Sequence, residues 1–473
     1  MIRASGFSLA LLGAYAQQAH AQDQPPPAAR LEAESIDAQD RPAQEHSIRV
    51  ELQRPVDARL LRMEKQGVEG CGLFDGKVYF VAGPKEVQAL SRRLKPGDQL
   101  VLSGTNWQNA RFTFSGRGTE AQPILVRPEV PGQVVFKGDS SVAFDGAHLV
   151  ITGLEFKDLA VTRKGSVIFR LGNGRDRPAA HCIVNRVTIA NCNSPDLADR
   201  PRVRMWYMVV RGHDNTVANS LFSDLKNFGQ MLAAQELPPG ELQRLHVLNN
   251  RFVNRPYLDE QNGYEIIQIG WSGEKARSAG SLIEGNVFEN CDGENEIISL
   301  KASDIVVRRN TFNACQGVLC LRSANRVLVE GNIFDGKGRS NTGGVRIQGS
   351  DHVIIENEFR NLRKPKNYYC WPISLMAASA ENYGDHGDVQ GYGRAKNILI
   401  ARNRFTANDA RIAVGIYPRP EYPLLPRSIQ VTDNVFRTTE AATSAFDYVA
   451  PDTTGALREN LHESGNKFLL LKR

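Results

Sequence analysis

The stretch Val306-Val307-Arg308-Arg309-Asn310-Thr311-Phe312 decides the fold, because a variant of it returns from Val327 to Phe334. Both copies place alternating apolar residues before an asparagine and a phenylalanine two residues after it. The same phrase recurs along most of the chain, with its asparagines at positions 250, 286, 310, 332, 357, 403, 434 and 466. The central gaps of 24, 22 and 25 residues give the basic period, and the longer gaps imply loops inserted in some coils.

A repeat of this length, built from short strands with no helical segments between them, is typical of a solenoid. Leucine-rich repeats would show helical stretches, and propeller blades would need about twice the period. The repeat therefore predicts an all-β, right-handed parallel β-helix. We expect the asparagines to stack from coil to coil at a turn and the phenylalanines to stack inside, so both sets have a structural role.

The first part of the chain differs from the repeat. Residues 22–75 contain Pro25-Pro26-Pro27 and continue without steady periodicity, which predicts a linker or a poorly ordered segment. From residue 76 to residue 473 we expect one β-helix domain. Residues 84–94 carry apolar side chains at helical spacing and are predicted to form an N-terminal capping helix that covers the open sheet edge.

Residues 1–21 have the pattern of a secretory signal peptide. Arg3 supplies a positive start, residues 7–16 form a short apolar run, and Ala19-His20-Ala21 offers a cleavage site. The pattern predicts a secreted or periplasmic protein whose mature chain begins near Gln22. A disordered cytosolic N-terminus is the alternative.

Composition excludes several other classes. The formal net charge of +6 is mild, and no Lys/Arg-rich tract suggests a nucleic acid partner. After the N-terminus no apolar run is long enough to cross a membrane. The cysteines are scattered, odd in number and without paired spacing, so we expect neither zinc nor a dense disulfide framework, although one disulfide stays open: Cys71, Cys182, Cys192, Cys291, Cys315, Cys320 and Cys370.

Charge interrupts the repeat at one place. Glu294 and Glu296 alternate in a β-rich run, so their side chains point to the same face of a strand. Lys301 follows, and Arg322 comes 21 residues later, close to one coil. Asn262 precedes Glu294 by 32 residues, one coil plus a loop, so we expect all five residues on one flank of three consecutive coils.

Two interpretations of this group stay open from spacing alone. In the first, the lysine and arginine neutralise the glutamates in a surface salt-bridge ladder, which stabilises the fold by only ~0–1 kcal/mol per pair. In the second, two carboxylates and an amide oxygen form an all-oxygen site suited to calcium. The two basic side chains would then be available to a substrate.

From about Val78 to about Phe436 the sequence resembles polysaccharide lyase family 6, the β-helical alginate lyases and chondroitinase B. The motifs that carry the resemblance keep their order along the chain: Lys95-Pro96-Gly97-Asp98, Phe114-Ser115-Gly116-Arg117-Gly118-Thr119, Gly153-Leu154-Glu155-Phe156, Asn262-Gly263-Tyr264-Glu265, Gly293-Glu294-Asn295-Glu296-Ile297-Ile298-Ser299 with Lys301, Leu321-Arg322, and Gly343-Gly344-Val345-Arg346-Ile347.

The resemblance implies a role for each charged residue. Lys301 would be the general base and Arg322 the general acid of a β-elimination, while Asn262, Glu294 and Glu296 would hold calcium. The base must be neutral to take the weakly acidic hydrogen at carbon 5 of a uronate sugar. Bound calcium and cationic side chains would stabilise the enolate-like charge that develops.

The chain departs from the family pattern at two places. Arg322 is followed by Ser323-Ala324, where the family commonly has His-Gly, and Gln268 stands where the family often has arginine. Both changes remove polar or positive substrate contacts, and we place Gln268 among the predicted substrate-binding residues.

Two further residues are candidates for substrate binding. Arg346 lies 24 residues after Arg322 and could clamp a carboxylate, with a plain surface arginine as the alternative. Trp371, in Tyr368-Tyr369-Cys370-Trp371, could stack on a sugar, with packing as the alternative. His352 is expected to be structural.

The sequence therefore predicts a secreted, calcium-assisted polysaccharide lyase whose substrate is an anionic, uronate-containing polysaccharide, with alginate as the first candidate. A lyase for dermatan sulfate or chondroitin is the alternative within enzymes. A non-catalytic β-helix that binds polysaccharide is the alternative from another class, because a fold alone does not fix chemistry.

Overall fold

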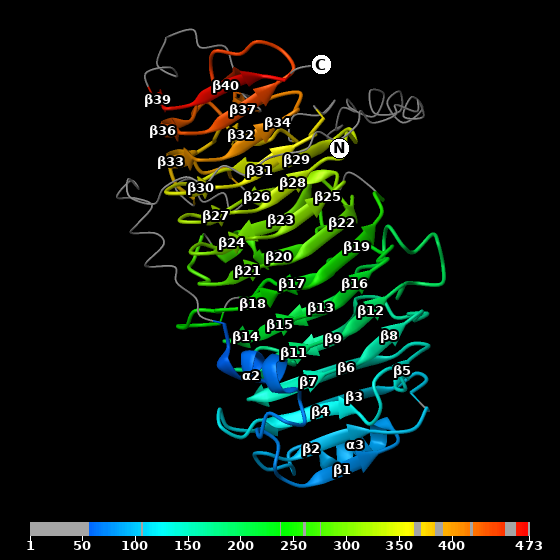
Figure 1. Cartoon of the computed structure of the whole chain (residues 1–473). Helices are drawn as coiled ribbons and strands as arrows, with labels where there is room; N and C mark the ends of the chain where they lie inside the picture. The colour runs from blue at the N-terminus through cyan, green and yellow to red at the C-terminus, as the bar shows by residue number, and fades with distance from the viewer. Residues whose placement is uncertain are drawn as a thin grey trace, which may run out of the picture. The chain divides into compact units, whose positions relative to one another are not determined.

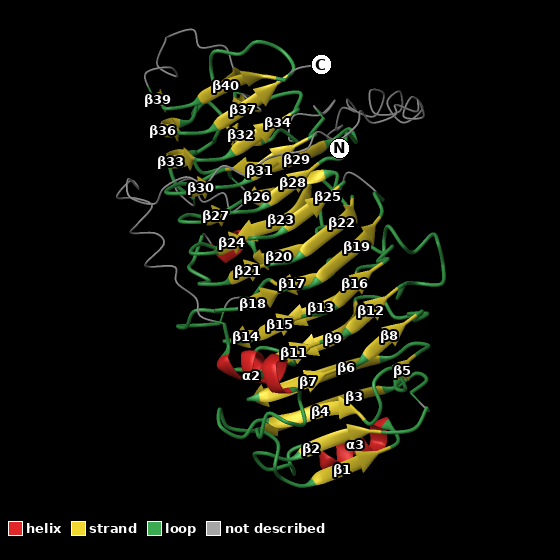
Figure 2. Cartoon of the chain, viewed as in Figure 1, coloured by secondary structure: helices red, strands yellow, loops and turns green. Residues whose placement is uncertain are grey.

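Three long parallel β-sheets form the walls of the protein in a computed structural model of the chain (Figures 1 and 2). The structure describes residues 56–471, except 106, 237, 259–261, 275, 364–369, 384–390, 417–419 and 450–459. The predicted signal peptide and residues 22–55 lie outside the described residues. All described residues belong to one compact unit, Ala38–Arg473.

The first sheet has 14 strands, each paired in parallel with the strand of the next coil. Its order is β1 (Val78–Val81), β2 (Gln99–Leu102), β4 (Ile124–Pro128), β7 (Leu149–Thr152), β11 (Ile183–Asn185), β15 (Thr216–Ala218), β18 (His246–Leu248), β21 (Leu282–Glu284), β24 (Val306–Arg308), β27 (Leu328–Glu330), β30 (Val353–Ile355), β33 (Lys396–Ala401), β36 (Arg427–Thr432) and β39 (Leu461–Ser464).

The second sheet also has 14 strands, and β3 (Arg111–Arg117) joins it by pairing with β6. The order of the others is β14 (Gly212–His213), β10 (Ala179–Ala180), β6 (Ser141–Ala147), β9 (Ser166–Leu171), β13 (Met205–Val210), β17 (Leu232–Ala234), β20 (Ile267–Gly270), β23 (Glu296–Lys301), β26 (Gly317–Leu321), β29 (Thr342–Ile347), β32 (Ile373–Met376), β35 (Ile412–Ile416) and β38 (Phe446–Tyr448).

The third sheet has 12 short strands. From the N-terminal end they are β5 (Val135–Phe136), β8 (Glu155–Lys157), β12 (Thr188–Ala190), β16 (Leu221–Ser223), β19 (Arg251–Arg255), β22 (Val287–Cys291), β25 (Thr311–Asn313), β28 (Ile333–Asp335), β31 (Glu358–Arg360), β34 (Arg404–Thr406), β37 (Val435–Thr438) and β40 (Lys467–Leu470).

Most coils contribute one strand to each of the three sheets, so the predicted right-handed parallel β-helix is confirmed. The asparagine of the repeat lies at the turn between the first and third sheets. The Asn310 amide donates to Asn332 Oδ1 at 2.9 Å, and Asn286 donates to Asn310 Oδ1 at the same distance. Both side chains are fully buried, so each amide satisfies the next one in the ladder.

The phenylalanine of the repeat stacks inside, as predicted. The rings of Phe312 and Phe334 are 4.7 Å apart and almost parallel, and the stack extends from Phe222 to Phe468. Such ring pairs contribute about 0.5–1.5 kcal/mol beyond the area they bury. The two ladders hold coil spacing constant from the middle of the chain to its C-terminal end.

The capping helix is confirmed with a shorter span than predicted. Helix α3 covers Pro84–Leu90 and begins with a proline in its first turn, where the missing N–H costs nothing. Its Val87 is fully buried in the core. The chain leaves the helix at Ser91, and Arg92 has a φ of 65°, so Leu94 belongs to the following turn. Figure 1 shows α3 beside β1 at the N-terminal end of the coils.

The expectation of a linker is wrong for residues 56–75. Helix α2 (Ala58–Gln66) lies on the outer face of the first sheet, where Leu60 and Met63 join a buried cluster with Leu125, Val150 and Ile183. The neighbouring Arg59 donates to the His181 carbonyl oxygen at 2.9 Å. Leu125, Val150 and Ile183 are apolar residues on the outer face of β4, β7 and β11. Helix α2 buries these side chains, which would otherwise be exposed to solvent.

The remaining sequence predictions about the fold concern cysteines and membranes. All seven cysteines are free and buried in the structure, where they act as small core residues. No helix among the described residues is long and apolar enough to cross a membrane. The short 3-10 helix η1 (Ser272–Glu274) completes the elements.

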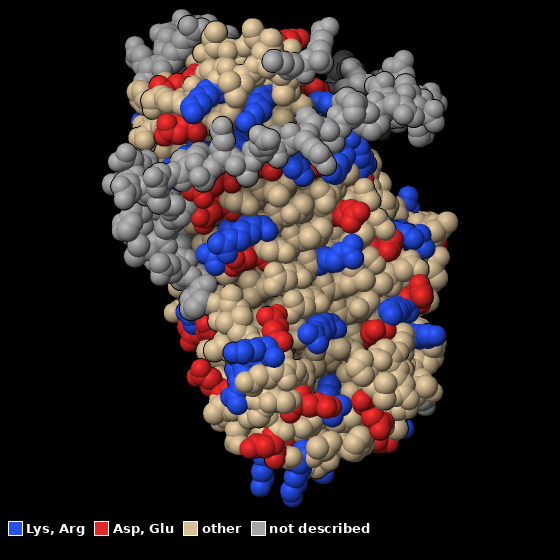
Figure 3. All heavy atoms as spheres, viewed as in Figure 1, with Lys and Arg blue, Asp and Glu red and all other residues tan. Residues whose placement is uncertain are grey.

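Acidic and basic side chains are interspersed on the face that Figure 3 shows. Many such charges form ion pairs between neighbouring coils, for example Arg308 with Glu284 at 2.8 Å and Arg326 with Asp304 at 2.7 Å. Pairs of this kind contribute little to stability. Charge by itself therefore does not mark a functional site, and burial and geometry must identify one.

Candidate active site

The predicted site residues come together on adjacent strands of the second sheet. Strand β23 pairs with β26, and β26 pairs with β29, which brings Ser299, Cys320 and Arg346 into one row. Lys301 ends β23 and Arg322 directly follows β26. The side chains of the alternate residues Ile298 and Leu300 enter the core, so Ser299 and Lys301 point outward. Glu296, Lys301, Arg322 and Arg346 therefore lie on or directly after strands of consecutive coils.

Glu296 is the carboxylate that the basic residues share. It is 5 % exposed, and its Oε1 lies 3.3 Å from Arg346 Nη1 and 3.7 Å from Arg322 Nε. Its Oε2 accepts a hydrogen bond from Ser299 Oγ at 2.5 Å. Burial acts to raise the pKa of Glu296, but the positive charges of Arg346, Lys301 and Arg322 outweigh it and lower this pKa. Glu296 is therefore ionised, as the salt-bridge interpretation required.

Glu294 has a different environment. Its Oε1 accepts from the backbone N–H groups of Gly263 at 2.8 Å and Tyr264 at 3.0 Å. Burial, reinforced by the negative charges of Glu265 and Glu296, raises the pKa of Glu294 well above its usual value. No basic side chain of the described residues forms an ion pair with it. Glu294 is a buried carboxyl group that lacks a compensating cation.

Asn262 lies next to this carboxyl group along the backbone. It immediately precedes Gly263, whose N–H binds Glu294, and its own side chain is exposed. The predicted neighbourhood of Asn262 and Glu294 is thus present. The hydrogen bonds to the Glu294 carboxyl group come from the backbone N–H groups of the next two residues, Gly263 and Tyr264.

Lys301 pairs with a carboxylate that the sequence did not single out. Its Nζ lies 3.6 Å from Glu265 Oε1, and Glu265 Oε2 accepts from Gln230 Nε2 at 2.7 Å. Glu265 is 2 % exposed, whereas the Lys301 side chain is 16 % exposed and can meet a ligand from solvent. Glu265 ends the motif Asn262-Gly263-Tyr264-Glu265, and its membership of that motif could have identified it as a site residue.

Tyr392 is the second residue that sequence reasoning missed. Its ring lies 4.3 Å from the Arg322 guanidinium, and its hydroxyl accepts from Arg346 Nη2 at 3.1 Å. A tyrosine face attracts a cation, so this ring holds both guanidinium groups in position. Tyr392 comes from a long insertion outside the repeat, where spacing gives no information about its place.

The structure gives Gln268 a positioning role where the sequence predicted substrate contact. It is 4 % exposed, and its Oε1 accepts from Gln230 at 3.0 Å and from Gln235 at 2.6 Å. Its Nε2 donates to the Gly270 carbonyl oxygen at 3.1 Å. A side chain with both polar atoms engaged inside the chain orders its neighbours and does not reach a sugar.

The predicted sugar-stacking role of Trp371 is also corrected. Trp371 is 8 % exposed and packs in an apolar cluster with Met376, Ala413 and Ile416. Packing, the alternative interpretation, is correct because a buried indole offers no free face. Tyr368 and Tyr369 lie outside the described residues. His352 is structural as expected, since it is fully buried and accepts from the Val327 N–H at 3.2 Å.

The oxygen-rich end of the site fits a hard cation. Calcium takes carboxylate and amide oxygens as ligands. Glu294 offers a buried carboxyl group without a positive partner among the described residues, and Asn262 precedes the segment that binds it. Glu296 would be shared between a cation and its two arginines. The donor types of Asn262, Glu294 and Glu296 therefore suit calcium.

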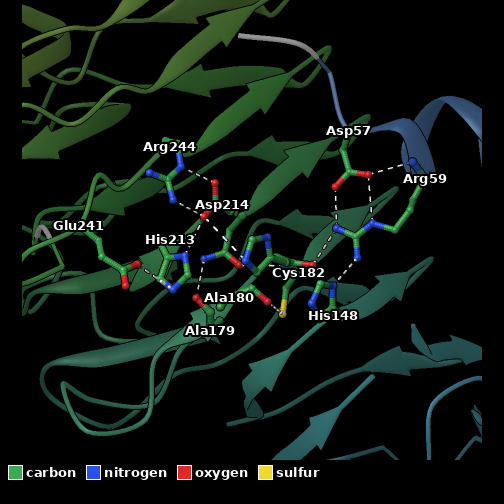
Figure 4. Close-up of polar contacts among 12 residues, drawn as sticks. Asp57, Arg59, His148, Ala179, Ala180, Cys182, His213, Asp214, Glu241 and Arg244 are labelled. Atoms are coloured by element: carbon green, nitrogen blue, oxygen red, sulfur yellow. Dashed lines mark hydrogen bonds and ion pairs between the residues drawn. The ribbon is translucent and has the colours of Figure 1, made fainter. Parts of the chain in front are cut away.

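A second group of donor atoms lies elsewhere on the coils (Figure 4). One nitrogen of His181, one of His213 and one oxygen of Asp214 lie within 4.8 Å of one another. Arg244 donates to Asp214 through Nε at 2.5 Å and Nη2 at 2.6 Å, and His213 Nδ1 lies 2.7 Å from the same carboxylate. Burial acts to raise the pKa of Asp214, but these hydrogen bonds lower it to about 2.

This group differs from the predicted calcium site in its chemistry. Imidazole nitrogens suit transition metals, whereas calcium prefers oxygen. Arg244 and His213 already satisfy the Asp214 carboxylate, so the group links consecutive turns of the β-helix. It remains a candidate metal group by composition and lies apart from Lys301 and Arg322.

The chain is a parallel β-helix that presents Lys301 and Arg322 beside buried carboxyl groups on the outer face of one sheet. The sequence model of chondroitinase B matches residues 81–432, well over half of the chain. The chain therefore belongs to the chondroitinase B family, polysaccharide lyase family 6, and it is an enzyme of the carbon–oxygen lyase class.

Solved structures agree with this assignment. A mannuronic acid specific polysaccharide family 6 lyase from human gut microbiota is 25 % identical, with a TM-score of 0.71 over 84 % of this chain and 87 % of that chain. The family 6 alginate lyase AlyGC is 24 % identical, with a TM-score of 0.71 over 83 % of this chain, which spans 51 % of that protein. The family 6 lyase Pedsa3628 from Pseudopedobacter saltans is 22 % identical, with a TM-score of 0.68 over 84 % of this chain and 93 % of that chain.

The last two structures support the fold alone at their level of identity. Comparison with curated proteins gave no match.

Proposed function

We propose that the chain cleaves a uronate-containing polysaccharide by β-elimination, with Lys301 as the base and Arg322 as the acid. The observation that carries the proposal is their arrangement. The two side chains project from consecutive paired coils, each is 16 % exposed, and each lies beside a buried glutamate. A base and an acid on neighbouring coils can act on the same sugar, the base on the hydrogen at carbon 5 and the acid on the departing glycosidic oxygen.

Lys301 removes the hydrogen at carbon 5 of the uronate. The neutral Nζ accepts the proton, and the ammonium group that forms lies beside Glu265 Oε1, 3.6 Å away. That carboxylate stabilises the new positive charge. Gln230 holds Glu265 from its other oxygen, so the acceptor stays oriented during the transfer.

Arg322, whose side chain is 16 % exposed, faces the charge that develops on the sugar, and the buried Arg346 adds positive charge next to it. They share a single carboxylate, Glu296, so the group keeps positive charge for the uronate carboxylate of the substrate. This charge stabilises the enolate-like intermediate, and the Arg322 guanidinium assists departure of the glycosidic oxygen. Arginine is a reluctant proton donor, so charge stabilisation is the larger part of its contribution.

Calcium is the cofactor that we propose, held by Asn262, Glu294 and Glu296. When bound, it would neutralise the uronate carboxylate and so make the hydrogen at carbon 5 more acidic. Removal of divalent ions with a chelator should abolish turnover, and added calcium should restore it. Full activity in protein shown to be free of metal would refute this part of the proposal.

Alginate is the substrate that we propose. The mannuronic acid specific relative supports a carboxylate-only polymer, and the residue that follows Arg322 in this chain is the uncharged Ser323. The family's chondroitinase B description supports dermatan sulfate or chondroitin as the second candidate. A β-helix that binds polysaccharide without cleaving it is the candidate from another class.

One assay separates these candidates. The protein is incubated with alginate, polymannuronate, polyguluronate and dermatan sulfate, and the absorbance of the unsaturated product is followed. We expect a signal with at least one alginate-type polymer. A signal with dermatan sulfate alone would select the second candidate, and no signal with any polymer would exclude lyase activity.

Lys301→Ala tests the assignment of the base. The variant should lose turnover by about 10²-fold or more, the usual contribution of a positioned general base, and should still bind the polymer. Turnover close to that of the wild type would contradict the assignment. Lys337→Ala is a matched control, because Lys337 is a half-exposed lysine on a turn away from the site.

Export is part of the same proposal, since the polymer is extracellular. We propose that residues 1–21 direct secretion to the periplasm or the medium. Sequencing the N-terminus of the exported protein should give a start near Gln22. Retention of an intact Met1 on protein found in the cytoplasm would contradict it.

A further inference from the structure

A second basic region lies on the outer face of the second sheet, close to its N-terminal end. Three arginines line a hollow of about 270 Å³ there, namely Arg111 from β3, Arg163 from the loop before β9, and Arg170 from β9 itself. The other described residues that line it are neutral, and they include the polar side chains of Ser141 and Asn173.

The positive charge of this hollow is not balanced. Arg111 and Arg163 both pair with one carboxylate, Asp139. The Arg170 side chain makes no hydrogen bond or ion pair with any residue in the described part of the chain, although it is half-buried. Three guanidinium groups thus face one carboxylate. Burial lowers the pKa of Arg170, and the nearby charges of Arg211 and Arg163 lower it further, as expected for a cation without an anion.

The hollow and the candidate active site share one face of one sheet. Phe169 and Leu171 enter the core, so the Arg170 side chain points outward, as Lys301 does. Strand pairing places Arg170 opposite Val209, then Ala233, then Gln268, then Ser299. These are four coil steps of about 4.8 Å, so the two sites are separated by roughly 19 Å.

No charged residue stands between the two sites in this row. The intervening outward residues are Val209, Ala233 and Gln268. A polymer with a carboxylate on every sugar would carry one carboxylate into the hollow while another sugar lies at Lys301. A short oligosaccharide at Lys301 would end before it reached Arg170.

We propose that Arg170, with Arg163 and Arg111, forms a distal subsite that binds a carboxylate of the polyuronate several sugars away from the site of cleavage. The proposal rests on the proposed function. Arg170 is the principal contact, because its side chain has no ion-pair partner to give up among the described residues, and Arg163 and Arg111 add charge. The subsite favours long polymers over short oligosaccharides.

The test compares Arg170→Gln with the wild type on a long alginate and on an alginate oligosaccharide of two sugars, which is too short to span both sites. Loss of one charge-assisted contact at a partly exposed site should raise KM for the long polymer about threefold to tenfold relative to its change for the oligosaccharide. Arg170→Lys keeps the charge and should recover part of the difference. Arg186→Gln is the matched control, an exposed arginine at a turn between the first and third sheets.

Equal changes in KM for both substrates, or the same length-dependent change in the Arg186 variant, would overturn the proposal. If the wild type cleaves none of the polymers, the proposed function fails and the subsite is tested by binding alone. Electrophoresis through a gel that contains alginate then compares retardation. Weaker retardation of the Arg170 variant than of the wild type would support the subsite, and equal retardation would overturn it.

Discussion

Glu294 and Glu296 are two residues apart in sequence and have opposite electrostatic environments. Glu296 faces two arginines and a lysine, and its pKa is lowered. Glu294 faces backbone N–H groups and two other carboxyl groups, and its pKa is raised. The difference arises because the arginines reach only Glu296. Glu294 is consequently the group whose ionisation a bound cation would control.

The raised pKa of Glu294 gives a stability prediction. A carboxyl group whose pKa in the folded state exceeds its unfolded value contributes stability below the unfolded pKa of about 4.5, and that contribution is lost as the pH rises through the folded value. Glu294→Gln does not ionise. In the presence of chelator, its melting temperature relative to that of the wild type should therefore rise between pH 4 and pH 8.

Calcium should reverse the order of the two proteins. Added calcium should raise the melting temperature of the wild type at pH 8 and have little effect on Glu294→Gln, because ligand binding to the folded state stabilises it. Calcium that stabilises both proteins equally would show that the ion binds elsewhere. The comparison needs no activity measurement.

Tyr392 gives a prediction about positioning. Tyr392→Phe keeps the ring over Arg322 and loses the hydroxyl that binds Arg346, whereas Tyr392→Ala loses both. A cation–ring contact is worth about 0.5–2 kcal/mol, so the alanine variant should lose threefold to thirtyfold in kcat and the phenylalanine variant less. Equal losses in the two variants, or a change in KM alone, would contradict a role in orienting Arg322.

At the scale of single elements, helix α2 shows how the first sheet is completed. The outer row of this sheet is apolar at Leu125, Val150 and Ile183, and the helix covers it with Leu60 and Met63. Adjacent residues Leu60 and Leu61 are 1 % and 51 % exposed, since consecutive helical residues face different directions. Substitution of Leu60 and of Leu61 therefore measures how much the packing of α2 on the first sheet contributes to the free energy of unfolding.

Leu60→Ala should lower the free energy of unfolding by about 2–4 kcal/mol, because it deletes buried methyl groups and leaves a cavity. Leu61→Ala should change it by less than about 0.5 kcal/mol. Urea denaturation followed by circular dichroism measures both. Similar values for the two variants would mean that α2 does not pack on the sheet in solution.

At the scale of the whole described structure, the asparagine ladder fixes the coils to one another. Each amide accepts a hydrogen bond through its oxygen from the preceding coil and donates one through its nitrogen to the next coil. Asn310 accepts from Asn286 and donates to Asn332 in this way. These groups are fully buried, and a buried polar group without a partner costs about 1–3 kcal/mol. A break in the ladder therefore affects two neighbouring coils at once.

Asn310→Ala should reduce the free energy of unfolding by about 2–4 kcal/mol, because two neighbouring amides lose a partner. Asn313→Ala, at a half-exposed position on β25, is the control and should have little effect. Thermal denaturation of both variants measures the difference. An unchanged melting temperature for Asn310→Ala would show that water replaces the ladder amide.

The sequence by itself determined the scaffold and most of the charged residues of the site. The Asn and Phe positions repeat at one coil length, and stacking of like residues is a local rule that every coil obeys, so the β-helix could be derived from their spacing. The same spacing placed Lys301 and Arg322 on consecutive coils. Glu294 and Glu296 were recognised because charge breaks an otherwise apolar pattern.

Only the tertiary structure decided which partner each charge has. Glu265 lies beside Lys301, and Tyr392 lies over Arg322, through segments inserted between repeats. Helix α2, which precedes the repeats, covers the first sheet, and Trp371 packs in an apolar cluster that no repeat position predicts. Contacts made by insertions join positions far apart in sequence, and no period relates them. The ladder that stacks the coils is repetitive, whereas the site depends on what the insertions bring to it.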